Sequence, residues 1–226
     1  MRRAAAILAC GIWCEGVTSG HDVITTPITF AREISRVVYA RCAQCHRPGG
    51  IAFSLLTYAE ARPWAVAIKE EVLERRMPPW GAVKGFGEFQ DDGGLTQEQI
   101  ELIGDWVEGG APEGDPALLP KAPSLARAAP VAVPAGIPVD GELSLKSDIK
   151  LTAIAPRRVA DGGSVMVTAT RPDGSVEPLL WLYRYKAQFP HVYWYRSSMR
   201  LPAATRIEVS PAGAATVALI TTPAAR

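Results

Sequence analysis

Apolar side chains in the first half of the chain recur at the three- and four-residue spacing that is typical of α-helices. The helical faces that they predict are formed by Phe30, Ile34, Val37 and Val38, by Trp64, Ile68 and Val72, and by Ile100, Ile103, Trp106 and Val107. Thr96 and Gln99 predict a capping box at the start of the last helix, and two prolines after Met77 end the helix before it. Residues 21–111 are therefore expected to form an all-α domain.

After residue 140 the period of the apolar positions changes to two, which is typical of half-buried β-strands. Strands are predicted at residues 149–154, 165–170, 179–185, 189–195, 206–209 and 216–221. The sequence Arg-Pro-Asp-Gly at 171–174 predicts a turn between the second and the third of them. Because no helical pattern lies between the strands, residues 141–226 favour a small antiparallel β-sandwich.

Seven prolines and many alanines lie between Pro112 and Pro138. Such a segment is stiff and partly of polyproline type, so residues 112–140 are predicted to be a linker. The expected fold class is multi-domain: an all-α domain, then a Pro/Ala-rich linker, then a small antiparallel β-sandwich.

The first residues have the pattern of an export signal. Two arginines precede an apolar run over residues 4–13, and small residues follow up to Gly20. This order predicts a signal peptide at residues 1–20 and a periplasmic or otherwise exported protein. A weak lipobox that ends at Cys10 also admits a lipid anchor there. No other apolar run is long enough for a transmembrane helix.

Charge narrows the range of partners. The 24 basic and 23 acidic residues give a formal net charge of +1, so no strongly basic face for nucleic acid is expected. The chain has three histidines and four cysteines, a supply that leaves little room for sites with several metal ions.

Cys42-Ala43-Gln44-Cys45-His46 has the Cys-x-x-Cys-His spacing of c-type haem attachment. Two thiols at this spacing reach both vinyl groups of one porphyrin, and the next imidazole then lies beneath the iron. Cys42 and Cys45 are thus the candidates for covalent attachment of one haem c, and His46 is the candidate proximal iron ligand. Two other chemistries use such a pair: thioredoxin-like exchange requires a βαβ setting, and a zinc site requires two further ligands.

Met77 is the candidate for the sixth ligand of the iron. The prolines that follow it restrict the backbone and would hold its thioether still, although a methionine at this place can also fill a gap in a core. Ligation by His46 and Met77 would occupy both axial positions and raise the reduction potential, which suits electron transfer.

These motifs carry a resemblance to known proteins. The Cys-x-x-Cys-His motif, Met77-Pro78-Pro79 and the helix that ends at Gly110 resemble class I cytochrome c domains. Over residues 28–118 the chain is similar to bacterial cytochromes that are fused to a copper type II, ascorbate-dependent monooxygenase-like domain.

The same resemblance extends to the C-terminal half, where it implies a His-x-His copper site just before the Pro-Asp-Gly turn. Arg157 and Val159 stand at those two positions, and neither side chain binds copper. No copper is therefore expected, and the β-sandwich is expected to be a non-catalytic accessory domain. His191 lies among seven aromatic residues between Trp181 and Tyr195, which predict an aromatic core or a surface for a partner.

The sequence thus favours an exported mono-haem c-type cytochrome that exchanges electrons with a redox partner protein. Two alternatives stay open. One is a haem-fed, copper-dependent monooxygenase-like oxidoreductase, which would require copper ligands elsewhere in the chain. The other is a haem-based module that senses redox state or gas, with the β domain recognising the partner.

Overall fold

The computed structural model describes residues 26–125 and 132–222, so the predicted signal peptide at 1–20 and Cys10 lie outside the described residues. The helical segments are η1 (Phe30–Ile34), α1 (Ser35–Val37), η2 (Val38–Cys42), α2 (Tyr58–Ala61), η3 (Arg62–Trp64), α3 (Ala65–Leu73), α4 (Gln97–Glu108) and η4 (Pro116–Leu118). The strands are β1 (Ile137–Asp140), β2 (Glu142–Ser144), β3 (Ile149–Val159), β4 (Val165–Thr170), β5 (Val176–Leu182), β6 (Tyr193–Leu201), β7 (Arg206–Ser210) and β8 (Ala215–Thr222).

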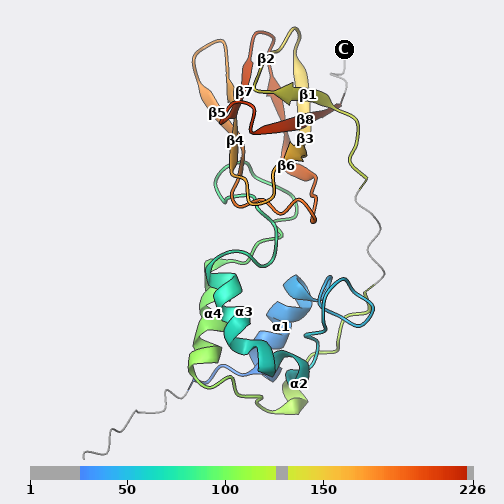
Figure 1. The fold of residues 1–226 in the computed structure, drawn as a ribbon, viewed down its shortest axis with the longest axis vertical. Helices are drawn as coiled ribbons and strands as arrows, with labels where there is room; N and C mark the ends of the chain where they lie inside the picture. The colour runs from blue at the N-terminus through green and yellow to red at the C-terminus, as the bar shows by residue number, and fades with distance from the viewer. Residues whose placement is uncertain (1–25, 126–131, 223–226) are drawn as a thin grey trace, which may run out of the picture.

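The strands form a β-sandwich of two antiparallel sheets, with the orders β1-β8-β3-β6 and β2-β7-β4-β5 (Figure 1). Alternating side chains of both sheets fill the space between them; those with no exposed surface include Leu151, Ile154, Val167, Leu179, Leu180, Leu182, Tyr193, Leu201, Ile207, Val217 and Leu219. The predicted turn at 171–174 joins β4 to β5, and Gly174 adopts a φ of 86° there. Glycine is favoured at this turn because it reaches positive φ without a steric cost.

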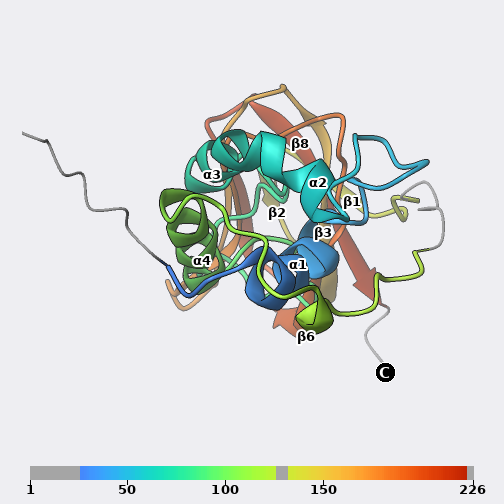
Figure 2. The same ribbon diagram turned by 90° about the horizontal axis from the view of Figure 1, so that it is seen from below.

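The predicted fold class is wrong, because the first half of the chain does not form an all-α cytochrome c domain. The described chain is mostly β, and its helices are short; α4, with 12 residues, is the longest helix of the described residues. Seen from the helical end, α1 to α4 lie in front of the sandwich, and long loops follow η2 and α3 (Figure 2). The physical reason is the glycine and proline content of residues 47–57 and 78–95, which interrupts the helical periodicity.

Part of this loop material belongs to the sandwich. Ala82 forms an antiparallel bridge with Leu182, and Phe89 forms another with Tyr195. Phe89 is buried in the core between the sheets, and Trp80 packs against the same core. Residues 80–92 therefore lie against the sandwich. The chain then returns to the helical half to form α4, which precedes β1 in the sequence.

Two strands lie where no alternation signals them. β1 pairs with β8 and lies inside the stretch that the proline content predicts as linker, and β2 pairs with β7. β6 begins at Tyr193 and not at residue 189, because the chain before it, which contains Pro190, forms a loop over residues 183–192. Proline lacks the N–H group that a paired strand donates, so it favours this late start.

The helical half has its own core around Trp106, whose side chain is fully buried. The indole Nε1 of Trp106 donates to the Pro112 carbonyl oxygen at 3.0 Å, so the ring is both packed and hydrogen-bonded. The capping box predicted at Thr96 and Gln99 is confirmed. Among the described helices, none combines the length and the hydropathy required to cross a bilayer.

Candidate functional site

The two cysteines and His46 lie on one tight turn at the end of η2. The backbone N–H groups of Cys45 and His46 both donate to the Cys42 carbonyl oxygen, at 3.1 and 2.9 Å. The turn therefore carries two thiols and one imidazole within five residues of the chain.

A loop over residues 47–55 folds back onto this turn. Ala52 N–H donates to the Cys45 carbonyl oxygen at 3.2 Å, and Leu55 N–H donates to the His46 carbonyl oxygen at 3.3 Å. Gly50 makes the close return possible, because a Cβ atom there would run into the Cys45 carbonyl oxygen. The glycine after the motif is thus a steric requirement of the turn.

The returning loop orients the imidazole of His46. Its Nδ1 lies 3.0 Å from the Phe53 carbonyl oxygen. Because a carbonyl oxygen only accepts hydrogen bonds, Nδ1 carries the proton and Nε2 keeps its lone pair. A hydrogen bond from the ring nitrogen that does not bind the metal is the usual means by which proteins fix the tautomer and the direction of a metal-binding histidine.

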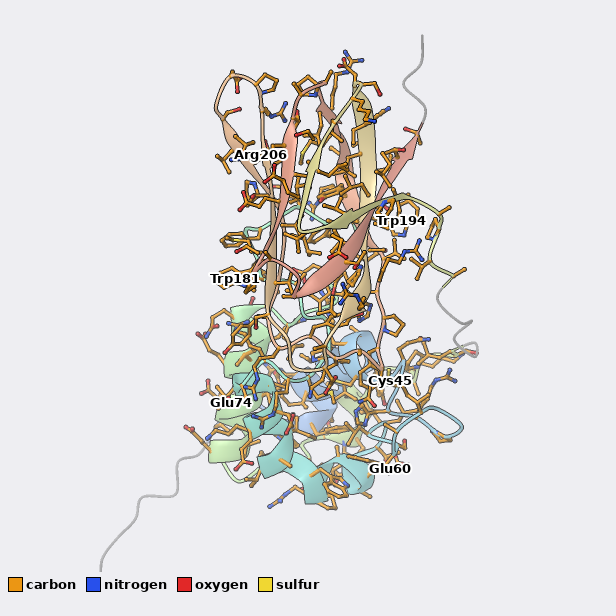
Figure 3. All side chains as sticks on the ribbon, turned by 45° about the horizontal axis from the view of Figure 1, so that its top comes forward. Cys45, Glu60, Glu74, Trp181, Trp194 and Arg206 are labelled. Atoms are coloured by element: carbon orange, nitrogen blue, oxygen red, sulfur yellow. The ribbon has the colours of Figure 1, made fainter. Side chains whose placement is uncertain are left out.

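Cys42, Cys45, His46 and Met77 line one cavity of about 620 Å³. This volume lies within the range of cofactor pockets, roughly 300–1,000 Å³. Apolar side chains make up most of the remaining wall; they include Ile51, Leu55, Ile68, Val72 and the stacked rings of Phe53 and Trp64, whose centroids are 4.5 Å apart. Gln188 and Phe189, from the loop before β6, also line it, and Cys45 lies near the junction of the two halves (Figure 3).

The thiols do not have the character of a redox-active pair. Burial, with a smaller contribution from Cys45, raises the pKa of Cys42 to about 12. Burial also raises the pKa of Cys45, against an opposing effect of Arg47. Reactive cysteines of Cys-x-x-Cys motifs have lowered pKa values, so the thioredoxin-like alternative loses support. Within residues 26–125 and 132–222, no three His, Cys, Asp or Glu side chains gather into a group that could hold a metal ion.

Met77 is held from the side of α3. Its N–H donates to the Glu71 carbonyl oxygen at 3.2 Å, and Arg76 forms two hydrogen bonds with the Glu71 carboxylate, at 2.9 and 3.0 Å. The side-chain hydrogen bond from Arg76 lowers the pKa of Glu71. The thioether of Met77 is soft and flexible, and the residue is 36% exposed.

The aromatic residues predicted around His191 form the contact between the sandwich and the segment after Met77. His191 lies against Trp80, with ring centroids 5.1 Å apart, and Trp80 lies 4.9 Å from Tyr193. Burial lowers the pKa of His191, and burial also raises the pKa of Tyr193. Sequence reasoning missed Phe53, Trp80 and Phe189 as site residues; the position of Trp80 directly after two prolines was the available signal.

The positions aligned with the His-x-His copper ligands lie elsewhere, on β3. Arg157 is exposed and donates to the Pro134 carbonyl oxygen, whereas Val159 is buried against the sandwich core. Neither Arg157 nor Val159 lines the cavity that contains the Cys-x-x-Cys-His turn. His191 lies in the loop before β6.

The donor set fits a covalently attached haem: two adjacent thiols, an imidazole whose Nε2 is free to coordinate, a thioether on the same cavity, and apolar walls. Zinc is less well served, since no group of three His, Cys, Asp or Glu side chains in the described part of the chain is placed to hold a metal ion. Comparisons of the chain with protein-family models, with curated proteins and with solved structures found no match.

Proposed function

We propose that the protein carries one covalently bound haem c and transfers electrons. The observation that supports this most is the shared cavity, which brings the Cys-x-x-Cys-His turn and Met77 to one apolar space. The hydrogen bond from His46 Nδ1 to Phe53 adds support, because it leaves Nε2 as the donor atom toward that space. Bound there, haem supplies reversible one-electron chemistry at its iron.

Each residue then has a distinct task. Cys42 and Cys45 form thioether bonds that keep the group in place, which suits a protein that is exported and would otherwise lose it. His46 and Met77 would hold the iron through an imidazole nitrogen and a thioether sulfur. Leu55 and Val72 make part of the wall apolar, and apolar surroundings together with a thioether ligand would favour the reduced state.

With His46 and Met77 as its two protein ligands, the iron would have no open position for a substrate. Electrons would then leave or enter through the edge of the group, so the proposed partner is another redox protein. This reasoning favours an electron carrier over the gas-sensing alternative, which requires an open position on the iron.

The proposal is tested by denaturing gel electrophoresis with haem staining of the protein produced in a host that matures c-type haem. The wild-type band should stain, and Cys42→Ala/Cys45→Ala should lose the stain. Met77→Ala is the matched control, because it should keep the covalent stain while losing the near-infrared sulfur-to-iron absorption band. A wild-type band without stain would reject the proposal.

A further inference from the structure

The backbone that follows Met77 is held by the sandwich. His191 Nε2 donates to the Pro79 carbonyl oxygen at 3.1 Å, and the Tyr193 hydroxyl donates to the Trp80 carbonyl oxygen at 2.6 Å. One residue further, Tyr183 N–H donates to the Gly81 carbonyl oxygen at 2.9 Å. Three consecutive carbonyl groups thus accept hydrogen bonds from the C-terminal half of the chain.

The helical half holds the backbone only on the N-terminal side of Met77. The N–H of Met77 donates to Glu71, but Pro78 and Pro79 have no N–H group to donate. The direction of the chain after Met77 is therefore set by the partners of the Pro79 and Trp80 carbonyl groups. Both partners are side chains of the loop before β6 and of β6 itself.

Methionine needs such support more than histidine does. Its side chain has three rotatable bonds, and a thioether is a weak axial ligand whose position depends on the backbone. Tyr193 is suited to fix that backbone, since its ring has no exposed surface and packs against Trp80. The neighbouring Phe189 lines the cavity itself, so the same part of the sandwich reaches the site directly.

We infer that Tyr193 and His191 are positioning residues that hold Met77 as the sixth ligand of the iron. The sandwich, on this inference, controls whether the iron is closed to external ligands. The inference rests on the proposed haem function.

A matched pair of tyrosines on β6 provides the test. Tyr193 and Tyr195 are both buried, and each donates its hydroxyl proton to a backbone carbonyl oxygen, Trp80 for the first and Leu179 for the second. Tyr193→Phe and Tyr195→Phe thus remove the same group from the same strand. Only the first removal affects the segment after Met77.

The full-length, haem-loaded variants are compared by the near-infrared sulfur-to-iron band, by the reduction potential and by the rate of carbon monoxide binding to the reduced protein. Tyr193→Phe should weaken or abolish the band, lower the potential and speed carbon monoxide binding at least tenfold, and Tyr195→Phe should leave all three at the wild-type values. His191→Leu should act like Tyr193→Phe, whereas His191→Gln, which keeps a donor, should restore most of the band.

The other outcomes are distinct. A wild-type band that persists unchanged in Tyr193→Phe and His191→Leu overturns the positioning role and leaves the proposed haem function intact. Equal loss in Tyr193→Phe and Tyr195→Phe also overturns it, because the cause is then a general weakening of the sandwich. A wild-type protein that stains for haem but lacks the band shows that Met77 is not the ligand, and one that does not stain rejects the proposed function itself.

Discussion

The two halves of the molecule use their apolar residues differently. In the sandwich, the side chains of facing sheets fill the space between them, as in most protein interiors. In the helical half, short helices enclose a compact core around Trp106, and further apolar side chains line a cavity of about 620 Å³. The helical half thus leaves an apolar space beside the Cys-x-x-Cys-His turn, whereas the space between the two sheets is filled by side chains, with Phe89 of the first half of the chain among them.

The largest expected effect comes from the helical core. Trp106→Ala should lower the free energy of unfolding by about 3–5 kcal/mol, because it removes a fully buried ring and its hydrogen bond to Pro112. The measurement is denaturant unfolding, combined with hydrogen exchange to locate the loss. Val176→Ala, at a position on β5 that is 63% exposed, is the control and should change stability by about 0.5 kcal/mol or less. Equal losses of protection in both halves after Trp106→Ala would show that they unfold as one unit.

The second largest effect is expected from the loss of the proposed covalent attachment of haem. If the proposed group is bound, amides of α3, which lines the cavity, should lose protection from hydrogen exchange by about a hundredfold in Cys42→Ala/Cys45→Ala, the factor lost when a ligand at a hundred times its Kd is removed. Amides of β3 and β8 should keep their protection, because these strands do not line the cavity. Unchanged protection in α3 would contradict the idea that the stability of the helical half depends on the proposed haem.

Two glycines of the segment that enters the sandwich give a smaller effect. A Cβ atom at Gly87 would lie 2.6 Å from the Leu179 carbonyl oxygen, whereas one at Gly85 would meet nothing within 4 Å. Both residues have positive φ, at 88° and 85°. Gly85→Ala should therefore cost only the backbone strain, about 1 kcal/mol, and Gly87→Ala about 1 kcal/mol more in thermal unfolding. Equal costs would show that residues 80–92 yield easily at the sandwich.

The smallest effect is the pH dependence of His191. Burial holds the pKa of His191 below the ordinary 6.5. Below about pH 6.5 the unfolded chain therefore binds a proton at His191 more readily than the folded chain does. Stability should accordingly be present above about pH 6.5 and fall as the pH drops from 7 to 5. Tyr193 packs beside the imidazole, and Asp91 lines the same pocket.

Denaturant midpoints at pH 7 and pH 5 measure this dependence, with His191→Gln as the comparison. The variant should show the smaller change between the two pH values, because it lacks the titrating group. A change as large as that of the wild type would assign the dependence to other groups.

Local signals predicted the elements that depend on local contacts. The pattern at residues 165–170 gave β4 with the same bounds, and the capping box of Thr96 marked the start of α4, because a turn or a cap involves residues three or four apart. The all-α expectation was wrong because spacing shows which side chains share a face but not how long a helix lasts between glycines. Phe89 could not be assigned to the sandwich, since its partner Tyr195 lies far along the chain.

The candidate site also has one part that the local sequence predicts and another part that it does not. The proximity of Cys42, Cys45 and His46 follows from one turn, and the Cys-x-x-Cys-His motif predicts it. The return of Phe53 to His46 depends on Gly50, a signal that only the geometry of the loop explains. The hydrogen bonds of His191 and Tyr193 join residues 112 and 113 positions apart, and no local pattern encodes them.

The excursion of residues 80–92 into the sandwich has a consequence for the order of events during synthesis. A chain that emerges from the ribosome completes the Cys-x-x-Cys-His turn and its Phe53 contact early, because both lie within 12 residues of sequence. Trp80 emerges soon after, but its hydroxyl partner follows only 113 residues later. The turn can therefore form while the segment after Met77 still lacks its partners, and those partners are present only once β6 has emerged.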